Sequence, residues 1–280
     1  QGIFKNVALL QGYSDVQIDT WWGVFSGKYK LLINVPISIA SAMAASSVPT
    51  LTASFAENDM ESVRSQINAA TRFVMVIAFP CTIGLAVLGE PIFRLLFPGT
   101  AQTAPMAAMM MYVGAFAVVF YAMSTLSNGL LQGINRMKIP VTNAAISLVA
   151  HVILLVILML FFHLQIYAVV IANMFFALMM CVMNSMAIRK YSGYKQEVIK
   201  TFAIPALASA IMGIVTWLFY HGCYALLKSN AISTVLSIII AAIVYAVTLL
   251  LFKGLTEEEI LRFPKGALLV RIAKKLHLLR

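Results

Sequence analysis

One lysine and three small polar residues recur at helical spacing in the apolar stretch that follows residue 22. Lys30, Asn34, Ser38 and Ser41 stand three or four positions apart, so on a helix they share one face. An ammonium group attracts anions, whereas amides and hydroxyls form hydrogen bonds with polar ligands. The stripe therefore favours binding of a polar, negatively charged molecule over bond-making chemistry.

Three further stripes carry polar residues at the same spacing. Together with the first, they place polar side chains on four separate helices, which predicts a shared polar interior. The alternative is structural, because Ser, Thr and Asn commonly join transmembrane helices through hydrogen bonds. The stripes are Tyr121, Thr125, Asn128 and Gln132; Asn143, Ser147 and His151; and Asn173, Ala177 and Asn184.

Lys30 and His151 each allow two interpretations. A lysine at the bilayer centre costs roughly 2.5–3.5 kcal/mol and usually faces a bundle interior or water, whereas one near a helix end extends to the headgroups. Lys28, on roughly the opposite side from Lys30, is expected to extend in that way. His151 is either a hydrogen-bonded core residue or a titratable group that faces a cavity.

Prolines inside the apolar stretches mark candidate hinges. Pro36, Pro80 and Pro205 each remove an intrahelical hydrogen bond, which leaves a kink where a moving helix could bend. Static kinks that serve packing are equally compatible with these positions.

Residues typical of enzymes do not gather in this sequence. Cys81, Cys181 and Cys223 are too few and too scattered for a metal site, and no cofactor motif is present. The ten acidic residues fall in predicted loops, helix ends or the tail, with Glu90 and Arg94 spaced for an i, i+4 ion pair. We therefore expect no catalytic centre and no metal or cofactor.

The elements that must position these residues are membrane-spanning helices. The chain is 61% hydrophobic and 11% charged, and apolar runs of about 20 residues recur along it. This composition predicts an all-α integral membrane protein with about seven spans. They are expected at 23–56, 69–97, 105–131, 139–162, 165–188, 200–221 and 231–253.

Three segments and one orientation follow from these spans. We expect residues 1–22 to contain the end of a preceding helix and an extracytoplasmic segment. Residues 23–253 are expected to form the seven-helix membrane lobe, and residues 254–280 a basic amphipathic tail. Most of the 20 Lys and Arg residues fall on the side of the C terminus, which the positive-inside rule places in the cytoplasm. The net charge of +10 is thus a topology signal and does not indicate nucleic acid.

Three stretches of the sequence carry a family resemblance. "NVPISIASAMAASSVPTLTASFAEND" and "RFVMVIAFPCTIGLAVLGEPIFRLLFPG" resemble the second half of bacterial polysaccharide exporters related to stage V sporulation protein B and lipid II flippase MurJ. These belong to the multidrug/oligosaccharidyl-lipid/polysaccharide superfamily. "STLSNGLLQGINRMKIPVTNAAIS" is similar to a helix-loop-helix of the same family. The resemblance implies one lobe of a two-lobed, MATE-like transporter, with the N-terminal lobe absent from this chain.

The activity that the resemblance implies is flipping of undecaprenyl-pyrophosphate-linked saccharide across the bacterial cytoplasmic membrane by alternating access. Lys30 would face the pyrophosphate, and the Asn, Ser and Tyr stripes would contact sugar hydroxyls. Membrane lipid, the lipid-linked substrate and the missing lobe are the implied partners. The sequence departs from the MurJ pattern at Leu31 and Asn34, where an arginine and a glutamate are expected.

Two other functions remain open at this stage. A cation-coupled multidrug exporter shares the superfamily fold, and it would be expected to keep a carboxylate within a span. A membrane-embedded glycan polymerase or ligase is more remote, because it should carry an acid, base or metal set on a substantial loop. No loop of this kind is predicted here.

Overall fold

The computed structural model describes residues 1–99, 102–254, 267 and 271, and every regular element in those residues is a helix. Six helical segments are long and apolar enough to cross a membrane, and a bent helix pair makes a seventh. The prediction of an all-α protein with about seven spans is therefore confirmed. The helices are α1 (Gly2–Leu10), α2 (Asp15–Val24), α3 (Lys30–Ala56), α4 (Met60–Leu96), α5 (Ala104–Gly114), α6 (Ala117–Gly133), α7 (Lys138–Leu160), α8 (Gln165–Ser192), α9 (Ile204–Leu227) and α10 (Asn230–Leu251).

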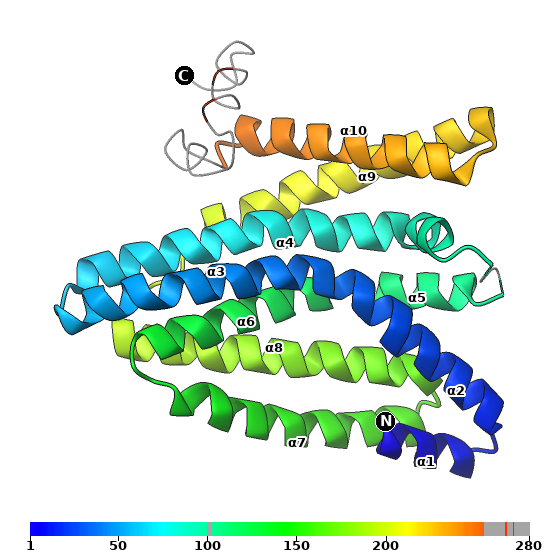
Figure 1. Ribbon diagram of the computed structural model, residues 1–280, viewed down its shortest axis with the longest axis horizontal. Helices are drawn as coiled ribbons and strands as arrows, with labels where there is room; N and C mark the ends of the chain where they lie inside the picture. The colour runs from blue at the N-terminus through cyan, green and yellow to red at the C-terminus, as the bar shows by residue number, and fades with distance from the viewer. Residues whose placement is uncertain (100–101, 255–266, 268–270, 272–280) are drawn as a thin grey trace. The chain divides into compact units, whose positions relative to one another are not determined.

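The chain divides into two compact units, residues 1–196 and 197–280. In the first unit α3 packs on α6, α6 packs on α8, and α7 covers the other side of α8 (Figure 1). α4 lies against α3, α5 and α6. The second unit contains α9 and α10, which pack on each other.

The first predicted span begins earlier than expected. α2 begins at Asp15, after the N-cap Ser14, whose side chain forms a capping box with Gln17. It continues through a π-helical turn, Phe25–Tyr29, into α3. Figure 1 shows the ribbon changing direction between α2 and α3, as expected at a π-helical turn. Lys30 therefore has about 22 Å of helix on its N-terminal side. Although Lys30 is the first residue of α3, it does not lie near an end of the continuous helical segment Asp15–Ala56.

Small residues let α3 and α6 approach closely. A Cβ on Gly129 would lie 2.8 Å from the Cβ of Ala44 and 3.2 Å from its backbone, and a Cβ on Gly133 would meet Leu51. Gly129 and Ala44 are both buried. This close approach brings the face of α3 that carries Lys30 beside α6.

The third span is broken, although the sequence predicts one continuous helix over 105–131. α5 and α6 meet at 54° beyond Gly114, where no proline is present. The Gly114 carbonyl accepts a hydrogen bond of 3.0 Å from the hydroxyl of Tyr29, and Val118 N–H donates to Ala115 O instead. Gly114 has no Cβ, and a methyl group there would overlap the Tyr29 hydroxyl. A tertiary contact thus accounts for the break.

The predicted hinge prolines occupy two kinds of position. α3 and α4 continue through Pro36 and Pro80. Pro205 lies just after the π-helical turn Ile199–Ala203, inside the continuous helical segment Ile199–Leu227. Their role as hinges stays a prediction.

The N-terminal segment packs on the turn between α7 and α8. Gln11 Nε2 donates to Met159 O at 2.6 Å, and Gln165 Nε2 donates to the Tyr13 hydroxyl at 2.9 Å. Lys5 pairs with Asp15 at 2.8 Å, and the hydrogen bond and charge of that carboxylate raise the pKa of Lys5. These contacts tie α1 to the first unit.

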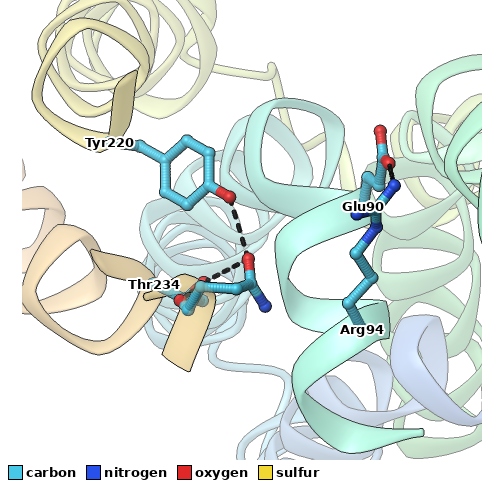
Figure 2. Close-up of polar contacts among 5 residues, drawn as sticks. Glu90, Arg94, Tyr220 and Thr234 are labelled. Carbon is cyan, nitrogen blue, oxygen red and sulfur yellow. Dashed lines mark hydrogen bonds and ion pairs between the residues drawn. The ribbon is translucent and has the colours of Figure 1, made fainter. Parts of the chain in front are cut away.

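The α9–α10 pair is built on small residues. Ser209, Gly213 and Thr216 of α9 are buried, as are Ser233 and Ser237 of α10. Near the start of α10, Asn230 Oδ1 accepts from the Tyr220 hydroxyl at 2.8 Å and from Thr234 at 3.4 Å (Figure 2). The predicted amphipathic tail, 254–280, lies almost entirely outside the described residues.

Candidate functional site

A cavity of about 190 Å³ lies in the first unit where α3, α6 and α8 meet. It contains the cationic end of the predicted α3 stripe, and we call it the Lys30 cavity. Two of the remaining stripes, on α6 and α8, each contribute one residue. Its lining residues are Phe25, Tyr29, Lys30, Ile33, Asn34, Ile37, Tyr121 and Asn173.

The polar groups of the Lys30 cavity keep free hydrogen-bonding capacity. Tyr121 donates to Asn173 Oδ1 at a long 3.4 Å, and Asn173 Nδ2 donates to Val169 O of its own helix at 2.8 Å. Lys30 and Asn34 are exposed. Amide and hydroxyl groups with one weak mutual bond can still bind a ligand.

The charge of Lys30 is not neutralised by any carboxylate among the described residues. The Nζ atom lies 5.1 Å from the Phe25 ring centroid, a cation–π contact that leaves the ammonium donors available. The rest of the lining is apolar or neutral. The cavity can therefore attract an anionic group and hydrogen-bond to its neighbours.

Lys28 lies elsewhere, as its spacing predicts. It is half-buried, with Nζ 5.4 Å from the Phe93 ring and 5.8 Å from the Phe97 ring at the end of α4. The two lysines of the opening stretch thus have different surroundings, and Lys28 does not line the Lys30 cavity.

A second group of predicted residues forms a closed hydrogen-bond network between α6, α7 and α8. Asn184 is fully buried at its centre. Asn143 Nδ2 donates to Asn184 Oδ1 at 2.8 Å, while Asn184 Nδ2 donates to Ser127 Oγ at 3.0 Å and Asn128 Oδ1 at 2.7 Å. We call this set the asparagine network. These bonds agree with the structural interpretation of the polar stripes, in which polar side chains join transmembrane helices through hydrogen bonds.

His151 and Ser147 also lie between α7 and α8. His151 Nδ1 is 2.8 Å from the carbonyl oxygen of Ala172, so this nitrogen donates, and its ring contacts Phe176 edge-on. Ser147 is fully buried, and its hydroxyl lies 4.0 Å from Met183 Sδ. Neither residue lines the Lys30 cavity.

The remaining predicted residues are dispersed. Ser38 and Ser41 are exposed on α3, and Ser38 donates to Val35 O of the same helix. Thr125 is half-buried on α6. Of the ten predicted site residues, Lys30, Asn34 and Tyr121 are the three that line the Lys30 cavity.

Two polar lining residues, Tyr29 and Asn173, were not among the predicted site residues. Asn173 belongs to a stripe that also holds Asn184, and spacing alone does not separate the member facing a cavity from the one in the network. Tyr29 is fully buried and reaches the cavity through the π-helical turn, for which the sequence carries no clear signal.

The acidic and metal-ligating residues show no alternative centre in the described part of the chain. Glu90 and Arg94 form the predicted i, i+4 ion pair at the end of α4 (Figure 2). No group of three His, Cys, Asp or Glu side chains that could hold a metal occurs in the residues that the structure describes. All three cysteines are free and half-buried.

Comparison with known proteins gives consistent matches. A family model described as "Lipid II flippase MurJ" matches residues 29–230. The chain is 23% identical over 218 residues to "Lipid II flippase MurJ" of Bacillus subtilis (strain 168), covering 76% of this chain and 39% of that protein. It is 29% identical over 189 residues to "Probable lipid II flippase MurJ" of Bdellovibrio bacteriovorus, covering 65% and 35%. The chain therefore spans well under half the length of these curated relatives.

Proposed function

The chain belongs to the lipid II flippase MurJ family, and from this premise we propose that it forms one lobe of a bacterial lipid flippase. Its cargo is a saccharide linked to undecaprenyl pyrophosphate, carried across the cytoplasmic membrane during synthesis of the cell wall or a surface polysaccharide. The two relatives are named as a lipid II flippase and a probable lipid II flippase, and flippases are transporters rather than enzymes. This agrees with the expectation that the chain has no catalytic centre.

The observation that carries the proposal is the Lys30 cavity. A unit charge about 4 Å from a phosphate gains on the order of 4 kcal/mol at an effective dielectric near 20, before desolvation. Lys30 supplies that charge, and Asn34, Tyr121 and Asn173 supply hydrogen-bonding groups for sugar hydroxyls. The exposed large side chains of the helices are mainly Leu, Ile and Val, a surface against which a prenyl chain can remain in lipid.

A second lobe completes the proposed carrier. The matched relatives are more than twice as long as the aligned part, which supports a partner lobe in the working transporter. In two-lobed carriers one lobe rocks against the other around a site near the midplane. Alternating access at the Lys30 cavity follows this scheme, with Pro36 and Pro80 as candidate bending points.

The alternative function, a cation-coupled multidrug exporter, has less support than the lipid flippase. Cation coupling favours a carboxylate near the binding site, and no carboxylate lines the Lys30 cavity. Glu90 is already paired with Arg94. A glycan polymerase or ligase would be expected to place carboxylates or histidines at its centre, and no Asp, Glu or His lines the Lys30 cavity.

Binding of an undecaprenyl-pyrophosphate glycan to the purified chain tests the proposal. Lys30→Gln should weaken binding by about tenfold or more, because it removes the phosphate-facing charge. Lys28→Gln removes the same charge two residues away and should change affinity less than about twofold. Equal affinities for both variants and the unaltered chain would contradict the proposed site.

Transport itself is tested in liposomes that hold a fluorescent prenyl-pyrophosphate glycan. The chain alone should leave the lipid on its original leaflet, because the opposing lobe is required. Co-reconstitution with the N-terminal half of a related flippase should restore flipping, and Lys30→Gln should remove it. Rapid flipping by the chain alone would contradict the one-lobe assignment.

The proposed orientation places the C terminus in the cytoplasm. Lys195→Cys and Leu226→Cys, in a background without the three native cysteines, should react with impermeant maleimide from opposite sides. Both positions are exposed in the structure. Reaction of both from outside the cell would overturn this orientation.

A further inference from the structure

A second cavity, of about 510 Å³, opens between the start of α7 and the end of α8. Lys138 and Thr142 line it from α7, and Lys190 and Tyr191 line it from α8. We call it the α7–α8 basic pocket. It lies where α7 begins and α8 ends, and therefore at the level where lipid headgroups meet a membrane protein.

Two cations line this pocket, and a third contacts one of its lining residues. Lys138 and Lys190 line it, and Arg136 Cζ lies 4.3 Å from the centroid of the Tyr191 ring. Lys190 Nζ is 5.5 Å from the same ring. No ion pair neutralises any of the three among the described residues. A cluster of uncompensated cations around a concave surface is complementary to an anion.

The first turn of α7 adds partial positive charge. It contains no acidic residue, and no side chain caps it. The helix dipole favours an anion near this end, although Pro140 has no N–H and the Ile139 N–H already donates to Arg136 O at 3.2 Å. The pocket thus offers two ammonium groups and the positive end of the α7 dipole to an anion.

Apolar rows lead from the pocket into the depth of the membrane. On α8, Met186 and Val182 follow Lys190 at four-residue steps, with 67% and 48% of their surfaces exposed. On α7, Val149 and Ile153 continue the row of Lys138 and Thr142, with 61% and 55% exposed. Such rows suit acyl chains that descend from a headgroup.

The pocket is separate from the Lys30 cavity. On α8 the cavity is lined by Asn173 and the pocket by Met186 and residues beyond it. At 1.5 Å per residue this separation is about 20 Å along the helix. Asn184, the centre of the asparagine network, lies between them on the same helix, and its partner Asn143 on α7 also lines the pocket.

We propose that the α7–α8 basic pocket binds the phosphate of an anionic membrane lipid, and that the lipid is a glycerophospholipid. The phosphate contacts Lys138 and Lys190 near the α7 N-terminus, and the acyl chains follow the apolar rows. The same phosphate chemistry could come from a soluble phosphate or from a prenyl pyrophosphate, so the test separates these sources. The site does not depend on the proposed transport activity.

The test measures lipid binding to the purified chain in neutral detergent by native mass spectrometry. Phosphatidylglycerol should bind at least about tenfold more tightly than phosphatidylcholine with the same acyl chains. Lys138→Gln combined with Lys190→Gln should remove this preference. Arg189→Gln combined with Lys195→Gln removes the same charge from exposed positions outside the pocket and should leave it within about twofold.

Two competitors identify the source of the phosphate. Glycerol phosphate should not displace phosphatidylglycerol at millimolar concentration, because it lacks acyl chains. Undecaprenyl pyrophosphate should bind in addition to phosphatidylglycerol, because its proposed site is the Lys30 cavity, and Lys30→Gln rather than the pocket variant should weaken its binding. Displacement by either competitor, with loss of its binding in the pocket variant, would overturn the assignment to a glycerophospholipid.

The controls separate lost binding from lost folding. All variants should keep the helical circular dichroism and melting temperature of the unaltered chain, and Lys138→Arg with Lys190→Arg should retain the preference. Should the double Gln variant fail to fold, each single Gln variant must weaken binding while the double Arg variant keeps it. Unchanged binding in the Gln variants, or equal loss in the Arg189 and Lys195 control, would refute the site.

Discussion

Asn173 and Asn184 lie on the same helix and on nearly the same face, yet their environments differ. Three turns separate them on α8. Asn184 is fully buried and makes hydrogen bonds to three side chains on α6 and α7. Asn173 is half-buried beside the Lys30 cavity, with one bond to its own helix and one long contact to Tyr121.

This difference separates two uses of polar residues in membrane helices. An amide whose donors and acceptor are all used holds helices together and has little capacity left for a ligand. An amide with spare donors at a cavity can bind a ligand, and it contributes little to packing. Stability and binding should therefore respond in opposite ways to changes in the two regions.

The largest expected effect is at the centre of the asparagine network. Asn184→Leu should lower the free energy of unfolding by about 2 kcal/mol, since interhelical hydrogen bonds in membranes average about 0.6 kcal/mol and three are lost. Asn173→Leu is the matched change and should cost less than about 0.5 kcal/mol. Unfolding in detergent by circular dichroism measures both, and equal costs would remove the distinction between the two regions.

A change at the α3–α6 contact should disturb both regions together. Gly129→Ala places a methyl group against Ala44, including its backbone, so the helices must separate at a cost of about 1–2 kcal/mol. Gly84→Ala in α4 meets no atom within 4 Å and should be neutral or slightly stabilising. Thermal unfolding of both variants checks this. A neutral Gly129→Ala would show that the close approach does not hold the regions in place.

A smaller effect on stability, paired with an effect on binding, is expected at Tyr121. Tyr121→Phe removes a hydroxyl whose bond to Asn173 is long, so unfolding should change by less than about 0.5 kcal/mol. Affinity for the undecaprenyl-pyrophosphate glycan should fall about three- to fivefold, as for loss of one ligand hydrogen bond. Titration by fluorescence measures it. A stability loss without an affinity loss would assign Tyr121 to packing.

The smallest effect is expected in the α9–α10 pair. Ser237 is fully buried on α10, and its hydroxyl has no hydrogen-bond partner among the described residues. Ser237→Ala should change unfolding by less than about 0.5 kcal/mol, or stabilise, because no bond is lost. Ser127→Ala, which removes a partner of Asn184, is the contrasting variant and should be the more destabilising. The reverse order would mean that the α9–α10 hydroxyls carry bonds comparable to the network.

Sequence patterns identified the polar stripes but not their separation into two regions. Lys30, Asn34 and Tyr121 were predicted as site residues and line one cavity. The polar residues Asn143, Asn128, Ser147 and His151 recur at the same helical spacing, but they make their contacts between packed helices. Helical periodicity predicts which face of a helix carries a side chain, whereas the neighbouring helix decides which groups that side chain contacts.

The sequence alone determined the helical class and the apolar spans, because hydrocarbon-length apolar runs leave few alternatives in a membrane. It also determined the family, since the family model matches residues 29–230. Tertiary structure decided the break before α6, where Tyr29 bonds to the Gly114 carbonyl, and the continuation of the first span back to Asp15. It also decided which asparagine faces a cavity and that Lys138 and Lys190 meet in one pocket. These features depend on contacts between residues far apart in the chain, and local periodicity carries no information on such pairs.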